Sequence, residues 1–268
     1  MLSFLRKIRK SLLESSPAGK SDEDSTKSEA SAKAGGSARK YLVYAIGEIA
    51  LVVIGILIAL QINNWNEHKK TETKVNDLLI ALKADLIQDT ILITEKLPFI
   101  IDQYHLNESL RARVAKPDAT LDTLIQIMHY EFNPNWSEQV TYNTNAYSSL
   151  NQTGLIENLP NNLKAQIKNF YNRKFTFNSR INRTTDDNRG KITSYVDTYT
   201  FGSTKIHDQG PLIDKLVWEN IDRGHLAATF QGISNFKRIL FTETKEELEF
   251  SLFNSRVLVA EIDSFLNK

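Results

Sequence analysis

The sequence of 268 residues has no cysteine, only 6 prolines and only 11 glycines. Without cysteine the chain has no disulfide framework, no thiol nucleophile and no attachment point for the lipid of a lipoprotein. So little proline and glycine excludes a collagen-like or low-complexity chain. Hydrophobic residues make up 41% and charged residues 24%. That composition is typical of a globular protein with one sizeable core.

Charge of either sign is also not in excess, since Lys and Arg number 33 and Asp and Glu number 32. Neutralising phosphates requires a clustered excess of basic residues, so we expect no nucleic-acid partner. The sequence lacks a Gly-x-Ser-x-Gly elbow and any glycine loop for nucleotides, which removes the most recognisable hydrolase and nucleotide-binding sites.

Metal-binding patterns are weak. The segment from Asp102 to His105 resembles half of a di-metal bundle site, but such a site takes two Glu-x-x-His motifs and two further carboxylates. The simpler interpretation of His105 is an ordinary surface or capping histidine. No pair among the five histidines has metal-ligand spacing, so we expect no metal and no cofactor.

The longest apolar run, residues 41–62, contains one ionisable residue and no proline. As a helix it would be roughly 33 Å long, enough to cross a hydrocarbon core of about 30 Å. Tyr41 and Tyr44 at one end and Trp65 at the other stand where an aromatic belt lies. The run begins too late and is too long for a cleaved signal peptide. We therefore predict a transmembrane helix over residues 41–65.

The residues before this run are more basic than those after it. Residues 1–14 form a short amphipathic pattern whose charged side holds Arg6, Lys7, Arg9 and Lys10, typical of a helix lying on an anionic leaflet. A helix packed on a partner, or a frayed terminus, is the alternative. Residues 15–40 have almost no large apolar residues and are predicted to form a disordered linker. The positive-inside rule then places the N-terminus in the cytoplasm and residues 66–268 in the periplasm.

The span carries a recognisable motif. The segment from Tyr44 to Ile49, YAIGEI, followed by LVVIGILIALQINNWNE from Leu51 to Glu67, resembles the signature of a family of uncharacterised single-span membrane proteins from Bacteroidota. The basic opening is similar to that family, whereas the long linker is a departure from it. The resemblance implies a bacterial inner-membrane protein with a mostly helical outer domain, and it implies no catalytic residue.

One stripe of the span is suited to helix packing. Glu48, Val52, Gly55 and Ala59 share a face, and the small pair Gly55 and Ala59 would let a second helix approach closely. We expect self-association or docking on a larger membrane complex. Three roles remain open for Glu48: a hydrogen-bonded carboxyl between helices, a group that snorkels to the interface, or a proton carrier.

The remainder predicts an all-α fold, in which the transmembrane helix continues into an antiparallel, four-helix-like bundle. Helical spacing continues to Leu97, and Pro98 is expected to end or kink that helix. We predict a returning helix over residues 99–114, a short helix over 121–130, a loop over 131–145 and a long helix over 163–199. Thr244 and Glu247 resemble a capping box that would open the last long helix.

The helix predicted over residues 163–199 has a polar interruption at Thr185, Asp186, Asn188 and Arg189. These residues are either a ligand or partner patch set into the bundle, or a solvated stretch or a turn at Gly190.

Taken together, the sequence favours a membrane-anchored periplasmic binding or scaffold protein over an enzyme, with the lipid bilayer and a second copy or a larger complex as partners. The alternatives are a membrane-tethered enzyme with a carboxylate site, or a proton-coupled accessory subunit that uses Glu48.

Overall fold

The computed structural model describes residues 30–134, 140–200 and 210–267. The chain divides into two compact units, Met1–Asn66 and Glu67–Lys268. The predicted basic helix over residues 1–14, with Arg6, Lys7, Arg9 and Lys10, lies outside the described residues.

Helix α2, Ala30–Val114, runs through the predicted span. It begins inside the predicted linker over residues 15–40, because residues 30–40 are rich in Ala, Lys and Arg, which favour helix. Every residue from 41 to 70 is exposed. In the described part of the chain, α2 is the one helix long and apolar enough to cross a membrane.

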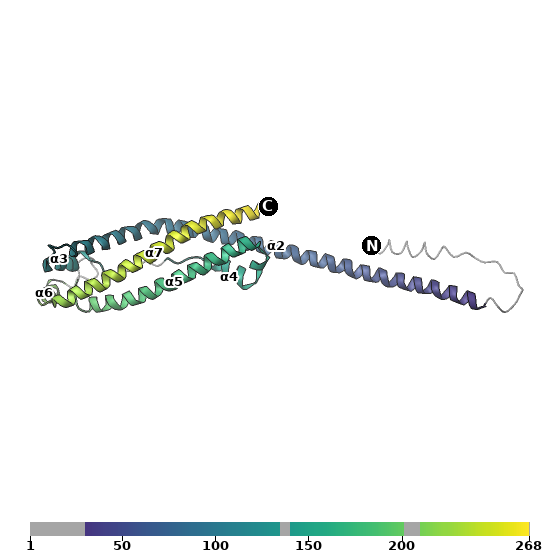
Figure 1. Cartoon of the computed structure of the whole chain (residues 1–268), viewed down its shortest axis with the longest axis horizontal. Helices are drawn as coiled ribbons and strands as arrows, with labels where there is room; N and C mark the ends of the chain where they lie inside the picture. The colour runs from purple at the N-terminus through teal and green to yellow at the C-terminus, as the bar shows by residue number, and fades with distance from the viewer. Residues whose placement is uncertain (1–29, 135–139, 201–209, 268) are drawn as a thin grey trace. The chain divides into compact units, whose positions relative to one another are not determined.

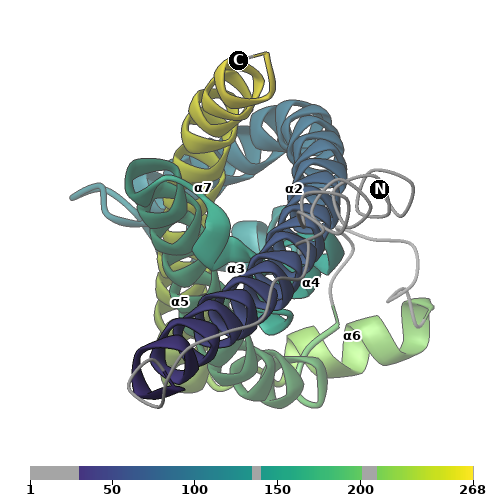
Figure 2. The same ribbon diagram turned by 90° about the vertical axis from the view of Figure 1, so that its right-hand side faces the viewer.

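The second unit is all-α in its described residues, as predicted. Its long helices are the remainder of α2, α5 (Asn161–Val196) and α7 (Arg223–Leu266). These three lie side by side, with α3 and α6 at one end (Figure 1). The described bundle is therefore built on three long helices rather than the four-helix-like set expected. Figure 2 shows the same helices from one end.

Polar contacts give the helix directions. Lys83, early in this part of α2, pairs with Asp263 late in α7, whereas Arg111, at the end of α2, donates to Asn235 early in α7. Helix α7 is thus antiparallel to α2. It is also antiparallel to α5. Leu163, at the start of α5, shares a cluster with Ile262 late in α7. Tyr195, at the end of α5, shares one with Leu226 early in α7.

The prediction that α2 turns back after Pro98 is wrong. Pro98 lies inside α2, and the helix continues to Val114. Ile93 and Ile100, on either side of the proline, are both buried in one apolar cluster with Phe241 and Leu248. An internal proline costs about 3 kcal/mol, and burial of about 1.5–3 kcal/mol per large apolar side chain offsets it.

The predicted start of the last helix at Thr244 is also wrong. Helix α7 begins at Arg223, after Asp222, whose side chain accepts a hydrogen bond from the His225 backbone N–H. Thr244 and Glu247 lie inside the helix and are buried. The capping-box pattern arises here because two polar residues face the interior three positions apart.

Shorter elements connect the long helices. They are α3 (Leu121–Gln126), the π-helix η1 (Ile127–Glu131), α4 (Asn145–Gln152), the 3-10 helix η2 (Leu155–Asn158) and α6 (Pro211–Glu219). Gly154 has a φ of 72° in the turn before η2, a conformation that favours glycine.

The core alternates between apolar and polar layers. One apolar cluster surrounds Leu82 and Tyr171, a second surrounds Ile100 and Phe241, and a third surrounds Leu110 and Tyr195. Buried polar side chains lie along the helices between these clusters. The first polar layer contains Asp89, Lys174, Glu247 and Ser251, and the second contains Asn107, Thr185, Asn188, Ser234 and Lys237.

Candidate functional site

An ion pair lies in the middle of the first polar layer. The Lys174 Nζ atom on α5 lies 2.7 Å from Asp89 Oδ2 on α2, and the two side chains are 1% and 2% exposed. Asp89 also accepts a hydrogen bond from the backbone N–H of Asn143 at 3.3 Å. Buried charges persist in proteins when they are paired and hydrogen-bonded, and this pair meets both conditions.

A carboxylate lies beside this pair. Glu247 on α7 accepts a hydrogen bond at 2.7 Å from the Tyr142 hydroxyl and another at 2.6 Å from the Ser251 hydroxyl. Tyr142 comes from the segment before α4, and its ring faces Lys174, whose Nζ atom lies 3.5 Å from the ring centroid. The aromatic ring thus stabilises the lysine charge as a cation–π partner.

Burial shifts the proton equilibria of all these groups. It raises the pKa of Glu247 and of Asp89, and lowers the pKa of Lys174, although the opposite charges nearby partly counter each shift. The pKa of Tyr142 is raised by burial and by the neighbouring Glu247 carboxylate, so its hydroxyl remains a donor. Each group is moved toward its neutral form, as desolvation requires.

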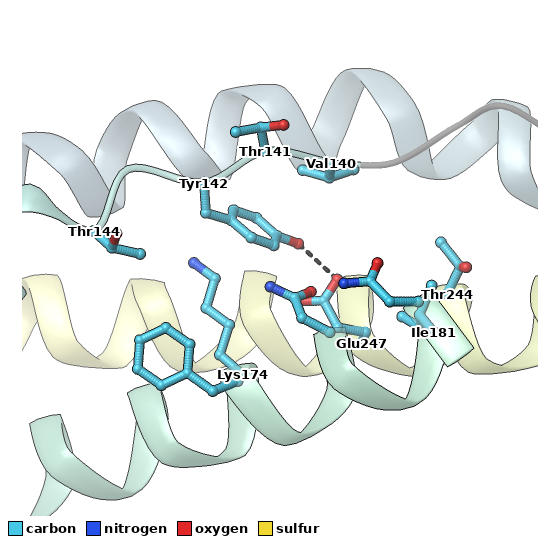
Figure 3. A pocket seen from close by; sticks show the side chains of 11 residues that line it. Val140, Thr141, Tyr142, Thr144, Lys174, Ile181, Thr244 and Glu247 are labelled. Carbon is cyan, nitrogen blue, oxygen red and sulfur yellow. Dashed lines mark hydrogen bonds between the residues drawn. The ribbon is translucent and has the colours of Figure 1, made fainter. Parts of the chain in front are cut away.

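Tyr142, Lys174 and Glu247 border a pocket of about 250 Å3, which we name the Glu247 pocket. Its wall is formed by residues 140–144, by α5 and by α7. Figure 3 shows the Tyr142 side chain reaching toward Glu247, to which a dashed line joins its hydroxyl, and the Lys174 side chain reaching toward Tyr142. Thr244 also lines the pocket and is 4% exposed, and its Oγ1 atom has no hydrogen-bond partner among the described residues. A buried hydroxyl without a partner costs free energy that a ligand or water recovers.

A sequence model of a family of unknown function, DUF6090, matches residues 48–201, more than half of the chain. The chain belongs to this family. The match covers Asp89, Tyr142 and Lys174 and ends before Glu247, so the DUF6090 region holds two walls of the pocket and α7 supplies the third. No curated protein and no solved structure matches the chain.

Sequence reasoning missed this pocket. Its charged residues, Lys174 and Glu247, are far apart in the chain, as is Asp89, the partner of Lys174, and none of the three belongs to a spaced motif. One sequence signal could have revealed Lys174. It lies seven residues from both Ile167 and Ile181, so helical spacing places it on the same face of α5 as these two buried residues. A lysine on the apolar face of a helix indicates a buried partner.

The predicted polar patch divides into two. Thr185 and Asn188 are buried, at 6% and 1% exposed, and the structure describes no partner for Thr185 Oγ1 or Asn188 Oδ1. Asp186 and Arg189 are exposed and form a 3.4 Å ion pair with each other. Helix α5 continues through Gly190, so a turn there is excluded. The buried half belongs to the second polar layer, and the exposed half is a solvated helix face.

The second polar layer holds another buried lysine. The Lys237 Nζ atom donates to the backbone carbonyl of Asn133, and burial lowers its pKa to about 8. Asn107 Nδ2 donates to the Ser234 carbonyl at 3.1 Å. No carboxylate pairs with Lys237 in the described residues, in contrast to Lys174.

The predicted span residues of this DUF6090 member are all exposed within the chain. This holds for Glu48, Val52, Gly55 and Ala59 and for the aromatic residues Tyr41, Tyr44 and Trp65. A Cβ atom added at Gly55 would meet no atom within 4 Å. The stripe is therefore free to receive a second helix, and its role stays a prediction.

Histidines form no metal site in the part of the chain that the structure describes. His129 lies 2.7 Å from Asp214 and stacks on Trp218 with ring centroids 4.3 Å apart. Burial alone would raise the pKa of Asp214, but hydrogen bonds from Thr200 and His129 outweigh it and lower that pKa. These contacts join α6 to η1, so we assign His129 a structural role.

Proposed function

We propose that the chain is a membrane-anchored binding protein whose helical domain receives a small polar ligand in the Glu247 pocket. The observation that carries the proposal is the pocket itself, which is lined by the Glu247 carboxylate and by Thr244, whose hydroxyl has no described partner. Small-molecule sites are concave and hold a few convergent polar groups.

The anchor is supported by the exposure of the apolar run. The side chains of residues 41–62 are exposed in the described chain, so a bilayer or another protein must cover them. The more basic flank before the run favours a cytoplasmic N-terminus and a periplasmic domain. The resemblance to single-span proteins from Bacteroidota favours a bacterial inner membrane. Within the bilayer, the stripe from Glu48 to Ala59 supports self-association or docking on a larger complex.

The absence of cysteine makes topology directly testable. Single variants Ser16→Cys and Asp118→Cys place one thiol on each side of the span in a chain that otherwise has none. In intact spheroplasts, a membrane-impermeant maleimide should label Asp118→Cys and should label Ser16→Cys only after lysis. Labelling of both variants in intact cells, or recovery of the protein in the aqueous fraction, contradicts the anchor.

Ligand binding is tested by identifying the small molecules that co-purify with the protein. The full-length protein would be transferred from its own membranes into nanodiscs, and small molecules released from it would be identified by mass spectrometry. Thr244→Phe fills the pocket and should abolish the released molecule, whereas Thr242→Phe on the exposed side of the same helix should not. Equal recovery from both variants contradicts a ligand site in this pocket.

A membrane-tethered enzyme is the second candidate. Glu247 and Lys174 line one pocket and have pKa values moved toward neutrality, as acid and base catalysts often do. As an enzyme, the protein should convert the molecule released from it, and Glu247→Gln should keep binding while losing conversion. Release of an unaltered molecule after prolonged incubation favours the binding protein.

A further inference from the structure

The charges around the Glu247 pocket are not balanced. Asp89 and Lys174 form a 2.7 Å ion pair and offset one another. Glu247 is held by two hydroxyl donors, from Tyr142 and Ser251, and its closest described basic group is already paired. Asp89 does not line the pocket but takes up the charge of Lys174, so the buried cluster holds one more carboxylate than cations, and that carboxylate is Glu247.

An anionic ligand is disfavoured by the position of Lys174. Its side chain is 1% exposed, its Nζ atom is bound to Asp89, and the Tyr142 ring covers it at 3.5 Å. An anion that used this ammonium would have to displace a buried carboxylate, which leaves an unpaired buried charge. It would also approach Glu247 without a compensating donor.

A cation that donates hydrogen bonds fits the groups that remain. Glu247 and Thr244 lie three residues apart on α7, so their side chains are neighbours on one face. Thr244 Oγ1 is an acceptor without a partner, and each Glu247 oxygen has accepted only one described hydrogen bond. Phe175 lines the same wall, and the π face of an aromatic ring attracts a cation more strongly than a neutral polar molecule.

We propose that the Glu247 pocket selects a small organic cation with a primary ammonium group, which donates to Glu247 and Thr244. The inference rests on the proposed function and names its ligand class. A volume of about 250 Å3 limits the ligand to a small molecule.

The experiment uses the full-length protein in nanodiscs of zwitterionic lipid and three probes of matched length: 1,4-diaminobutane, 1,4-butanediol and succinate. Calorimetry should show binding of the diamine, with the diol and succinate weaker by about tenfold or more, because a charge-assisted hydrogen bond is lost. Glu247→Gln should weaken diamine binding by about tenfold or more. Glu246→Gln, which changes an exposed neighbour paired with Arg180, should leave it unchanged.

Two further measurements test the proposal even if Glu247→Gln disturbs folding. Thr244→Val is nearly isosteric, removes the second acceptor and should weaken the diamine about three- to tenfold. Lowering the pH should also weaken it, because a proton competes for Glu247. The groups facing that carboxylate are Tyr142, Ser251, Lys174 and Asp89.

Tighter binding of succinate, equal binding of the diol, or no binding of any probe overturns the ammonium ligand. Such a result rejects the ammonium ligand class but not ligand binding itself. Ligand binding is tested separately, by the molecule that co-purifies with the protein, so failure of one hypothesis is distinguishable from failure of the other.

Discussion

The two buried polar layers of the bundle use lysine in opposite ways. Lys174 has a carboxylate partner at 2.7 Å and an aromatic ring above it, and it borders a pocket. Lys237 is also buried and also has aromatic rings beside it, of Phe132 and Phe241, but its described acceptor is a backbone carbonyl. In the same layer, Thr185 Oγ1 and Asn188 Oδ1 have no described partner. The comparison teaches that burial alone does not indicate a site. The first layer holds an ion pair and a carboxylate that lines a pocket, whereas the second is an incompletely satisfied part of the core.

The largest effect should come from breaking the paired layer. Lys174→Met leaves Asp89 as an unpaired buried carboxylate, which costs about 3–5 kcal/mol of unfolding free energy. The double variant with Asp89→Leu removes both charges and should recover most of the loss. Urea unfolding of the full-length protein, followed by loss of helical circular dichroism, measures both. A loss below about 1 kcal/mol for the single variant would contradict a functional ion pair.

The unpaired layer should respond to pH instead. Because the pKa of Lys237 is about 8 in the folded protein and about 10.5 when unfolded, the unfolded state binds more protons between these values. The cost of burying the charge is fully present below about pH 8 and is relieved as the pH rises. The unfolding free energy of the wild type should gain up to about 3 kcal/mol relative to Lys237→Met over that range.

The quantity to measure is the difference in unfolding free energy between the wild type and Lys237→Met at each pH. Tyrosines with raised pKa values titrate similarly in both proteins, so their contribution cancels in this difference. A difference that stays constant from about pH 7 to 9.5 would show that Lys237 has an anionic partner.

A smaller loss is expected at the hydroxyl of Tyr142. Tyr142→Phe removes the donor to Glu247 and should destabilise the protein by about 1–2 kcal/mol. Tyr147→Phe is the control, since Tyr147 stacks on Tyr171 through its ring and keeps that contact. Equal losses in the two variants would mean that the Glu247 hydrogen bond contributes nothing specific.

The smallest effect should have the opposite sign. Thr185→Val replaces a buried hydroxyl that has no described partner with a methyl group of similar volume. We expect an increase of about 0.5–1 kcal/mol in unfolding free energy. If thermal melting instead shows destabilisation of similar size, the second polar layer is satisfied by bound water and resembles the first more closely than we infer.

Sequence periodicity was sufficient for the long helices and failed at their ends. The spacing of Ile167, Phe170 and Ile181 predicts α5 because one face of that helix is buried along its whole length. Pro98 and the Thr244–Glu247 pattern misled, since both are local signals that tertiary packing overrides. The polar interruption in α5 correctly marked buried polar groups at Thr185 and Asn188, although their neighbours Asp186 and Arg189 face solvent.

By itself the sequence determined the all-helical fold, the helical spacing and the one apolar run long enough to cross a bilayer, because each depends on residues close together in the chain. Only the tertiary structure decided which polar residues meet. Asp89 and Lys174 are 85 positions apart, and Tyr142 and Glu247 are 105 apart. Their contacts depend on which helix faces are buried together and on how the three helices align, and neither is encoded by a local pattern.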